Sequence, residues 1–196
     1  RQYDEARRKA AKTETIQHRL TSLGRDVTGQ EVHFRIAGGK VAHVPINDLV
    51  KRMRKEVVRR RSWLMKFPTH TGTVGPVRGF TMDYVVQRQL ASVVNELRTG
   101  YGQVRIMLAG WKITPTAELK AESLAEALRT DSRFLQEVRV APDTATVTFW
   151  VYPDSFAVFR RLQKAVRNEG LRVAARPLPF GVPIAGSPRG SRSSGQ

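Results

Sequence analysis

The sequence predicts an α+β fold in which a mixed sheet of about five strands packs against three helices. Three observations support this prediction: a hairpin pattern over residues 31–44, an amphipathic helix after Pro45, and a strand–helix–strand pattern over residues 144–176. The chain has 196 residues, of which 40% are hydrophobic, so it is long enough to bury a core. We expect three parts: a helical stem over residues 1–27, an α+β domain over residues 31–176, and an extended tail over residues 177–196.

The stem is predicted from apolar residues spaced by four, three and four positions, the a/d pattern of a coiled-coil seam. These residues are Ile16, Leu20, Leu23 and Val27. Two arrangements fit the pattern. The helix packs on its own domain, or it self-associates as a stem that continues from residues upstream of Arg1, where we expect a membrane anchor.

The predicted hairpin (EVHFRIAGGKVAHV) turns at Gly38-Gly39, because a two-residue turn of this type needs positive φ angles. This turn pairs Phe34 with His43 and His33 with Val44. The two imidazoles therefore point to opposite faces of the ribbon.

The helix that follows Pro45 is predicted to end near residue 59. Its apolar stripe has the 3.6-residue period of a helix packed on a core. The stripe consists of Ile46, Leu49, Val50, Met53 and Val57.

The middle of the chain is predicted element by element. Residues 66–79, with three Gly and two Pro, indicate a loop or an irregular edge. Residues 80–90 and 103–113 favour strands. Residues 91–102 fit either a short helix or a strand end. Thr114-Pro115 is typical of a helix start, so a helix is expected to run to about Arg129. It would turn Leu124 and Leu128 inward and a ladder of Glu118, Glu122 and Glu126 toward solvent.

The C-terminal pattern predicts a βαβ unit with parallel strands joined by a right-handed crossover. In the first strand, Val147, Phe149 and Val151 alternate with polar or bulky neighbours. Asp154 is expected to cap the following helix and Gly170 to end it. The helix's inner residues would be Phe156, Phe159, Leu162 and Val166, and residues 171–176 would return as a strand.

Catalytic and metal-binding motifs are not recognisable in the sequence. It has no Cys, and none of its four His (His18, His33, His43 and His70) has a second ligand at metal spacing. No phosphate-binding glycine loop or nucleophile elbow is present. We therefore predict a non-enzymatic protein with no cofactor and no small-molecule ligand. An enzyme with a dispersed site remains a third hypothesis, which a pocket joining His70, Arg78 and Asp83 would support.

Positive charge is the strongest functional signal, because 34 Lys and Arg against 17 Asp and Glu give a net charge of +17. It is concentrated in KRMRKEVVRRR, on the predicted helix 47–61. This segment is either a solvated helix face or a site for a polyanion: nucleic acid bound without sequence preference, anionic lipid, or an acidic protein. The candidate polyanion-binding residues are Lys51, Arg52, Arg54, Lys55, Arg59, Arg60 and Arg61.

Two resemblances to known families concern the C-terminal half and the hairpin. Residues 150–196 (WVYPDSF to GVPIAGSPRGSRSSGQ) resemble the C-terminal signature of a family of uncharacterised bacterial proteins, and VHFRIAGGKVAHVPINDLVKRM and GTVGPVRGF resemble it more loosely. In that family the domain follows a membrane helix and a coiled-coil stem. Residues 144–178 also resemble the periplasmic domains of ExbD and TolR, partner subunits of proton-driven membrane motors, although the motor family's membrane helix is not in this chain.

These resemblances imply no activity and no active-site residues. Together with the stem pattern, they lead us to expect a scaffold or protein-interaction domain, with an unknown protein partner, tethered to a membrane on its periplasmic or cytoplasmic side. The alternative is a nucleic-acid-binding module that uses the basic helix.

Overall fold

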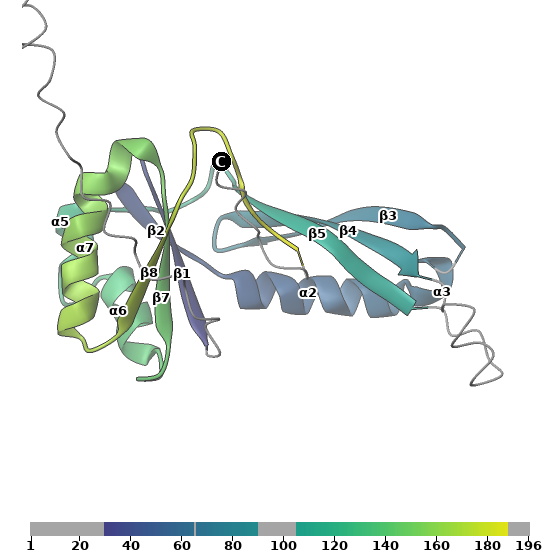
Figure 1. Cartoon of the computed structure of the whole chain (residues 1–196), viewed down its shortest axis with the longest axis horizontal. Coiled ribbons are helices and arrows are strands. Elements are labelled where there is room, and N and C mark those ends of the chain that lie inside the picture. Colours follow the sequence, from purple (N-terminus) through teal and green to yellow (C-terminus); the bar gives the residue numbers. More distant parts are fainter. Residues whose placement is uncertain (1–29, 65, 90–104, 188–196) are drawn as a thin grey trace, which may run out of the picture.

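The structure is a computed structural model that describes residues 30–64, 66–89 and 105–187. It confirms the α+β class, with two sheets that form two lobes side by side (Figure 1). The first sheet has the strand order β6-β2-β1-β7-β8, and the second has the order β3-β4-β5-β9. Helices α5, α6 and α7 cover the outer face of the first sheet, and α2 lies along the second sheet (Figure 1). The predicted five-stranded mixed sheet is present; the second sheet was not predicted.

The bounds of the elements are as follows. The first sheet and its helices comprise β1 (Glu31–Ala37), β2 (Lys40–Val44), β6 (Glu122–Ser123), α5 (Leu124–Ala127), α6 (Arg133–Val140), β7 (Thr146–Val151), the short 3₁₀ helix η1 (Pro153–Ser155), α7 (Phe156–Asn168) and β8 (Arg172–Pro177). The second sheet and its helices comprise α2 (Ile46–Arg59), α3 (Arg61–Leu64), β3 (Thr69–Val77), β4 (Phe80–Gln89), β5 (Arg105–Pro115) and β9 (Ile184–Gly186).

The hairpin prediction is confirmed in its turn and in its register. Gly38 and Gly39 have φ angles of 58° and 69°, which a residue without a Cβ adopts at little cost. Phe34 pairs with His43, and His33 pairs with Val44. The two imidazoles therefore lie on opposite faces of the first sheet.

The C-terminal βαβ unit is also confirmed, because β7 and β8 are parallel neighbours and α7 connects them. Of the predicted inner residues, Leu162 and Val166 are buried and Phe159 packs against the same cluster. Phe156 is wrong: it is 40% exposed, because at the helical period it lies roughly 100° around α7 from the buried pair. Gly170, just after α7, has a φ of 83°.

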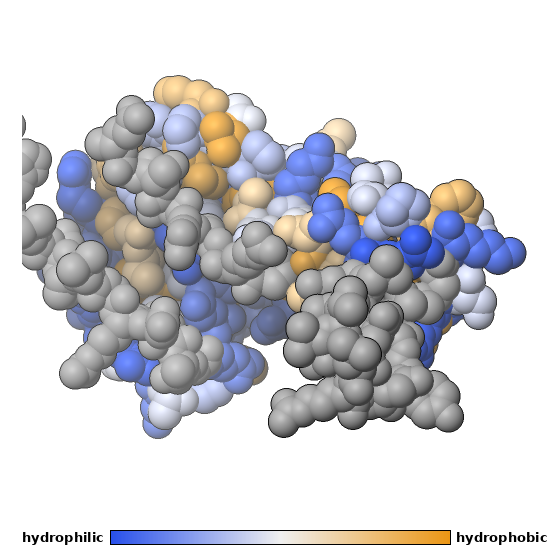
Figure 2. Space-filling model, turned by 45° about the vertical axis from the view of Figure 1, so that its right-hand side comes forward, coloured by the Kyte–Doolittle hydropathy of each residue, from blue (hydrophilic) through white to orange (hydrophobic). Residues whose placement is uncertain are grey.

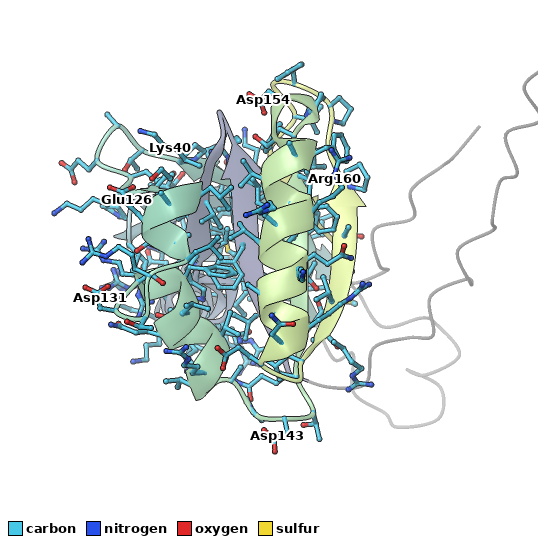
Figure 3. The ribbon with its side chains drawn as sticks, turned by 90° about the vertical axis from the view of Figure 1, so that its left-hand side faces the viewer. Lys40, Glu126, Asp131, Asp143, Asp154 and Arg160 are labelled. Atoms are coloured by element: carbon cyan, nitrogen blue, oxygen red, sulfur yellow. The ribbon has the colours of Figure 1, made fainter. Side chains whose placement is uncertain are left out.

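The predicted cap is wrong, however. Oδ2 of Asp154 accepts a hydrogen bond from the Gly38 N–H at 3.0 Å, and Oγ of Ser155 accepts one from the Gly39 N–H at 3.1 Å. These two side chains hold the hairpin turn and do not cap α7; Asp154 is labelled in Figure 3.

Residues 69–77, expected to be a loop or an irregular edge, form the edge strand β3. Its register shifts between Val74 and Val77, around a cis peptide bond before Pro76. Gly72 is compatible with this strand because the Tyr84 ring lies against it: a Cβ at position 72 would be 2.5 Å from Cζ of Tyr84. The glycine thus makes room for a cross-strand ring instead of breaking the strand.

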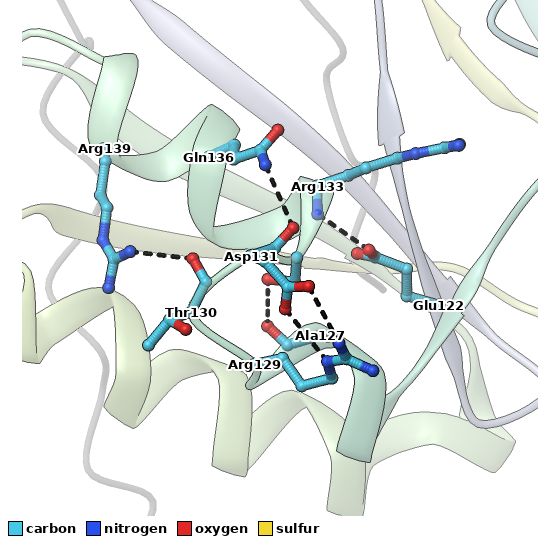
Figure 4. Close-up of polar contacts among 9 residues, drawn as sticks. Glu122, Ala127, Arg129, Thr130, Asp131, Arg133, Gln136 and Arg139 are labelled. Carbon is cyan, nitrogen blue, oxygen red and sulfur yellow. Dashed lines mark hydrogen bonds and ion pairs between the residues drawn. The ribbon is translucent and has the colours of Figure 1, made fainter.

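The helix predicted over residues 114–129 is wrong. Strand β5 continues to Pro115, and the helical part is only α5, which Ser123 and Glu126 cap reciprocally. Glu122 is not part of a solvated ladder, because its carboxylate accepts hydrogen bonds from the backbone N–H groups of Arg133 and Phe134 at 2.8 and 3.0 Å. It thereby caps α6, a helix that was not predicted. Figure 4 shows the contact with Arg133. Leu128, expected to face inward, is exposed.

The tail that was predicted to be extended is ordered against the two sheets in its described part, residues 177–187. Ile184 is buried in β9, which pairs with β5. The Tyr152 hydroxyl donates to the Val182 carbonyl at 2.6 Å, and the Leu178 N–H donates to the Val151 carbonyl at 2.9 Å. This part of the tail therefore joins the second sheet to the first. The stem (1–27), residues 91–102 and the tail's last residues (188–196) lie outside the described residues.

Two clusters of buried hydrophobic residues form the core of the molecule. One lies between the first sheet and its helices, with Phe34, Phe149 and Leu162 fully buried. The other lies between α2, the second sheet and the opposite face of the first sheet, where Trp150 contributes. Because both faces of β7 are covered, all six of its residues are buried.

Candidate functional site

The basic segment lies on α2 and the start of α3, with its backbone fixed by the second sheet. Ile46, Leu49 and Met53 are buried, while Val50 and Val57 are partly buried against the same cluster. This is the predicted apolar stripe, and α2 ends at Arg59 as expected. The opposite side of the helix faces solvent.

All seven candidate polyanion-binding residues are exposed, and we call them the basic face: Lys51, Arg52, Arg54, Lys55, Arg59, Arg60 and Arg61. Glu56 forms ion pairs with both Arg59 and Arg60, and Nζ of Lys51 lies 3.8 Å from Oδ1 of Asp48. The other four have no acidic partner among the described residues. Such exposed cationic side chains are accessible to an anion.

Apolar side chains are exposed at the C-terminal end of the basic face. Val58 lies on the solvent side of α2, three and four residues after Lys55 and Arg54. Trp63, in α3, lies with its ring centroid 4.7 Å from that of Phe67, and His70 meets the Trp63 ring edge-on at 4.8 Å. We call Val58, Trp63 and Phe67 the apolar tip.

Sequence reasoning missed a second exposed basic surface, on α7. It consists of Arg160, Arg161, Lys164 and Arg167, with Arg160 labelled in Figure 3. Their helical spacing was the signal that could have revealed it. In Figure 2, hydrophilic and hydrophobic residues are interspersed on the part of the surface that grey atoms do not cover.

A cavity of about 460 Å³ lies where the two sheets meet, between β2, α6 and the turn that joins β3 to β4. Nη1 of Arg78 lies 3.2 Å from Nδ1 of His43 and pairs with Glu137. Burial lowers the pKa of His43, the Glu137 carboxylate opposes this, and Arg78 adds to it. The trio links the lobes, and sequence reasoning missed it because its members are far apart in the chain.

The residues of the dispersed-site hypothesis are not brought together. Arg78 lines the cavity, whereas His70 contacts Trp63 at the apolar tip. Asp83 accepts a hydrogen bond from Thr73 and pairs with Lys112 on the second sheet. The cavity that Arg78 lines includes neither His70 nor Asp83.

His33 lies on the face of the first sheet opposite the helices, 6.3 Å from the Trp150 ring. Burial lowers its pKa to about 4, against the raising effect of Glu31, while Arg176 and His43 lower it further. In the unfolded chain the pKa of His33 is about 6.5. As the pH falls from 6.5 towards 4, His33 therefore becomes protonated in the unfolded chain while it stays neutral in the folded chain.

We expect the free energy of unfolding to fall by about 2 kcal/mol because of His33 alone when the pH is lowered from about 7.5 to about 5. Urea unfolding at the two pH values measures this change. In the His33→Gln variant the change should be smaller by that amount. An equal fall in both proteins would contradict the assignment.

The described ranges contain no group of three or more His, Cys, Asp or Glu that could hold a metal ion. None of the helices there has the length and hydrophobicity to cross a bilayer.

No protein-family model, curated protein or solved structure matches the chain. The family resemblances drawn from the sequence therefore stay predictions.

Proposed function

We propose that this chain is a non-enzymatic interaction domain that works at a membrane and uses the basic face of α2 to hold a polyanionic partner. The observation that supports the proposal most strongly is the state of the cations: seven exposed cations lie within residues 51–61, and four of them have no acidic partner among the described residues. The buried stripe of α2 holds the helix, so little backbone ordering is needed on binding.

The proposal is tested with vesicles and nucleic acid at low salt. The full chain should bind phosphatidylglycerol vesicles or a short DNA duplex, but not neutral phosphatidylcholine vesicles, and added salt should release it. Binding to neither polyanion at low salt would refute the proposal. Binding to DNA without binding to vesicles would favour the alternative, a nucleic-acid-binding module.

Glu56 provides a test in the opposite direction. Because the Glu56 carboxylate pairs with Arg59 and Arg60 and cancels one positive charge, the Glu56→Gln variant should bind the polyanion about fivefold more tightly, on a scale of about 1 kcal/mol per charge near an anionic surface. The matched control is Glu169→Gln, which frees Arg139 beside α7. Vesicle sedimentation measures both affinities. Unchanged or weaker binding by the Glu56 variant would count against the basic face as the contact.

A further inference from the structure

The apolar tip distinguishes the basic face from the basic surface of α7. Val58 is 74% exposed, Trp63 45% and Phe67 43%, all at the end of α2 and α3. Figure 1 places this end of the molecule away from α7 and the first sheet. Trp63 and Phe67 are exposed in contact with each other, and Val58 is exposed one helical turn after Arg54 and Lys55. Large hydrophobic side chains exposed near cations are typical of a surface that meets a partner.

The chemistry of the tip favours lipid over nucleic acid. Val58 has no group that can pair with a phosphate or a base, and it lies within one helical turn of Arg54 and Lys55. The Trp63 ring is already in contact with Phe67 and His70, which limits its use as a stacking platform for bases. Trp beside Lys and Arg, with an aliphatic side chain exposed on the same helix, matches the composition of segments that lie in a membrane interface.

We propose that α2 and α3 dock on the surface of an anionic phospholipid bilayer, with the cations against the headgroups and the apolar tip inserted at the headgroup level. This inference rests on the proposed function and names its partner. The cations supply long-range attraction, while the tip supplies contacts that salt does not screen. The surface therefore rests on the bilayer without crossing it.

The test uses an environment-sensitive fluorophore, because the chain has no Cys and a single introduced thiol is the only site of labelling. The Val58→Cys variant carries a nitrobenzoxadiazole label at the tip. The control is Val140→Cys, a valine of similar exposure (83%) on α6 in the other lobe. Both full-length proteins are titrated with phosphatidylglycerol vesicles, phosphatidylcholine vesicles and a DNA duplex.

We expect the label at position 58 to brighten several-fold and shift to the blue with phosphatidylglycerol vesicles only, and to be quenched by spin-labelled lipid. The label at position 140 should not change. In addition, Val58→Ser should weaken vesicle binding by about tenfold, the order expected for losing one inserted aliphatic side chain, and Val140→Ser should not.

Each outcome decides between the two proposals. If the chain binds the vesicles but the label at position 58 stays in water, insertion is refuted and the charge-based function stands. If it binds only DNA, the lipid assignment is refuted. If it binds neither, both proposals fail together. If the labels at 58 and 140 respond equally, docking through this end of the molecule is refuted.

Discussion

Replacing Arg52, Arg54, Lys55 and Arg61 by Gln weakens binding to phosphatidylglycerol vesicles by about 10²- to 10³-fold at low salt, since each cation near an anionic surface contributes about 1 kcal/mol. These are the four residues of the basic face without an acidic partner among the described residues. All four are exposed, so the fold should be unaffected. Sedimentation with vesicles measures the affinity, and circular dichroism checks the fold.

The control variant removes the same number of charges from the other basic surface. It replaces Arg160, Arg161, Lys164 and Arg167 on α7, which are equally exposed, by Gln. We expect this variant to lose much less affinity, because its charges lie in the lobe away from the proposed contact. If the two variants lose equal affinity, the net charge of the chain, and not the basic face, accounts for binding.

The Phe149→Ala substitution lowers the free energy of unfolding by about 4 kcal/mol, the typical cost of a cavity left by a fully buried Phe. The Phe149 ring is completely buried in β7. Its centroid lies 5.7 Å from that of Phe34 and 5.6 Å from that of Phe159, so the cluster beneath the first sheet loses its central ring.

Urea unfolding measures this loss. Phe180→Ala is the control, because Phe180 is mostly exposed and its removal should change the free energy of unfolding by less than about 0.5 kcal/mol. A loss below about 1 kcal/mol for Phe149→Ala would contradict the packing of β7 against α7, since it would mean that the site is not fully buried.

The elements that were predicted correctly are those with a local cause. Gly38-Gly39 determines the hairpin turn and, through it, the pairing of Phe34 with His43. The βαβ unit follows from alternation in β7 and the 3.6-residue period in α7. The same period correctly placed the buried stripe of α2.

The elements that were missed depend on partners distant in the sequence. Gly72 suggested a loop, but Tyr84 on the neighbouring strand explains it. Glu122 fitted a solvated helix face, although it caps α6 eleven residues later. Three residues of the expected tail form a strand because β5 offers them an edge. The spacing of residues within one segment does not indicate these contacts with distant segments.

In the candidate site, too, the features with a local cause were predicted and those that depend on distant residues were missed. Helical spacing predicted the exposure of only some cations of the basic face, and which of them form ion pairs required the position of Glu56. The trio of Arg78, His43 and Glu137 comes from three separate elements, and no motif predicts it.

The salt dependence of vesicle binding tests the central claim most directly. The logarithm of the affinity for phosphatidylglycerol vesicles is measured against the logarithm of the salt concentration for the wild-type chain and for the two charge variants. We predict a steep fall for the wild type, the same slope for the α7 variant, and a clearly flatter slope for the variant of Arg52, Arg54, Lys55 and Arg61. A wild-type slope that is retained after these four cations are removed would contradict the claim that the basic face makes the contact.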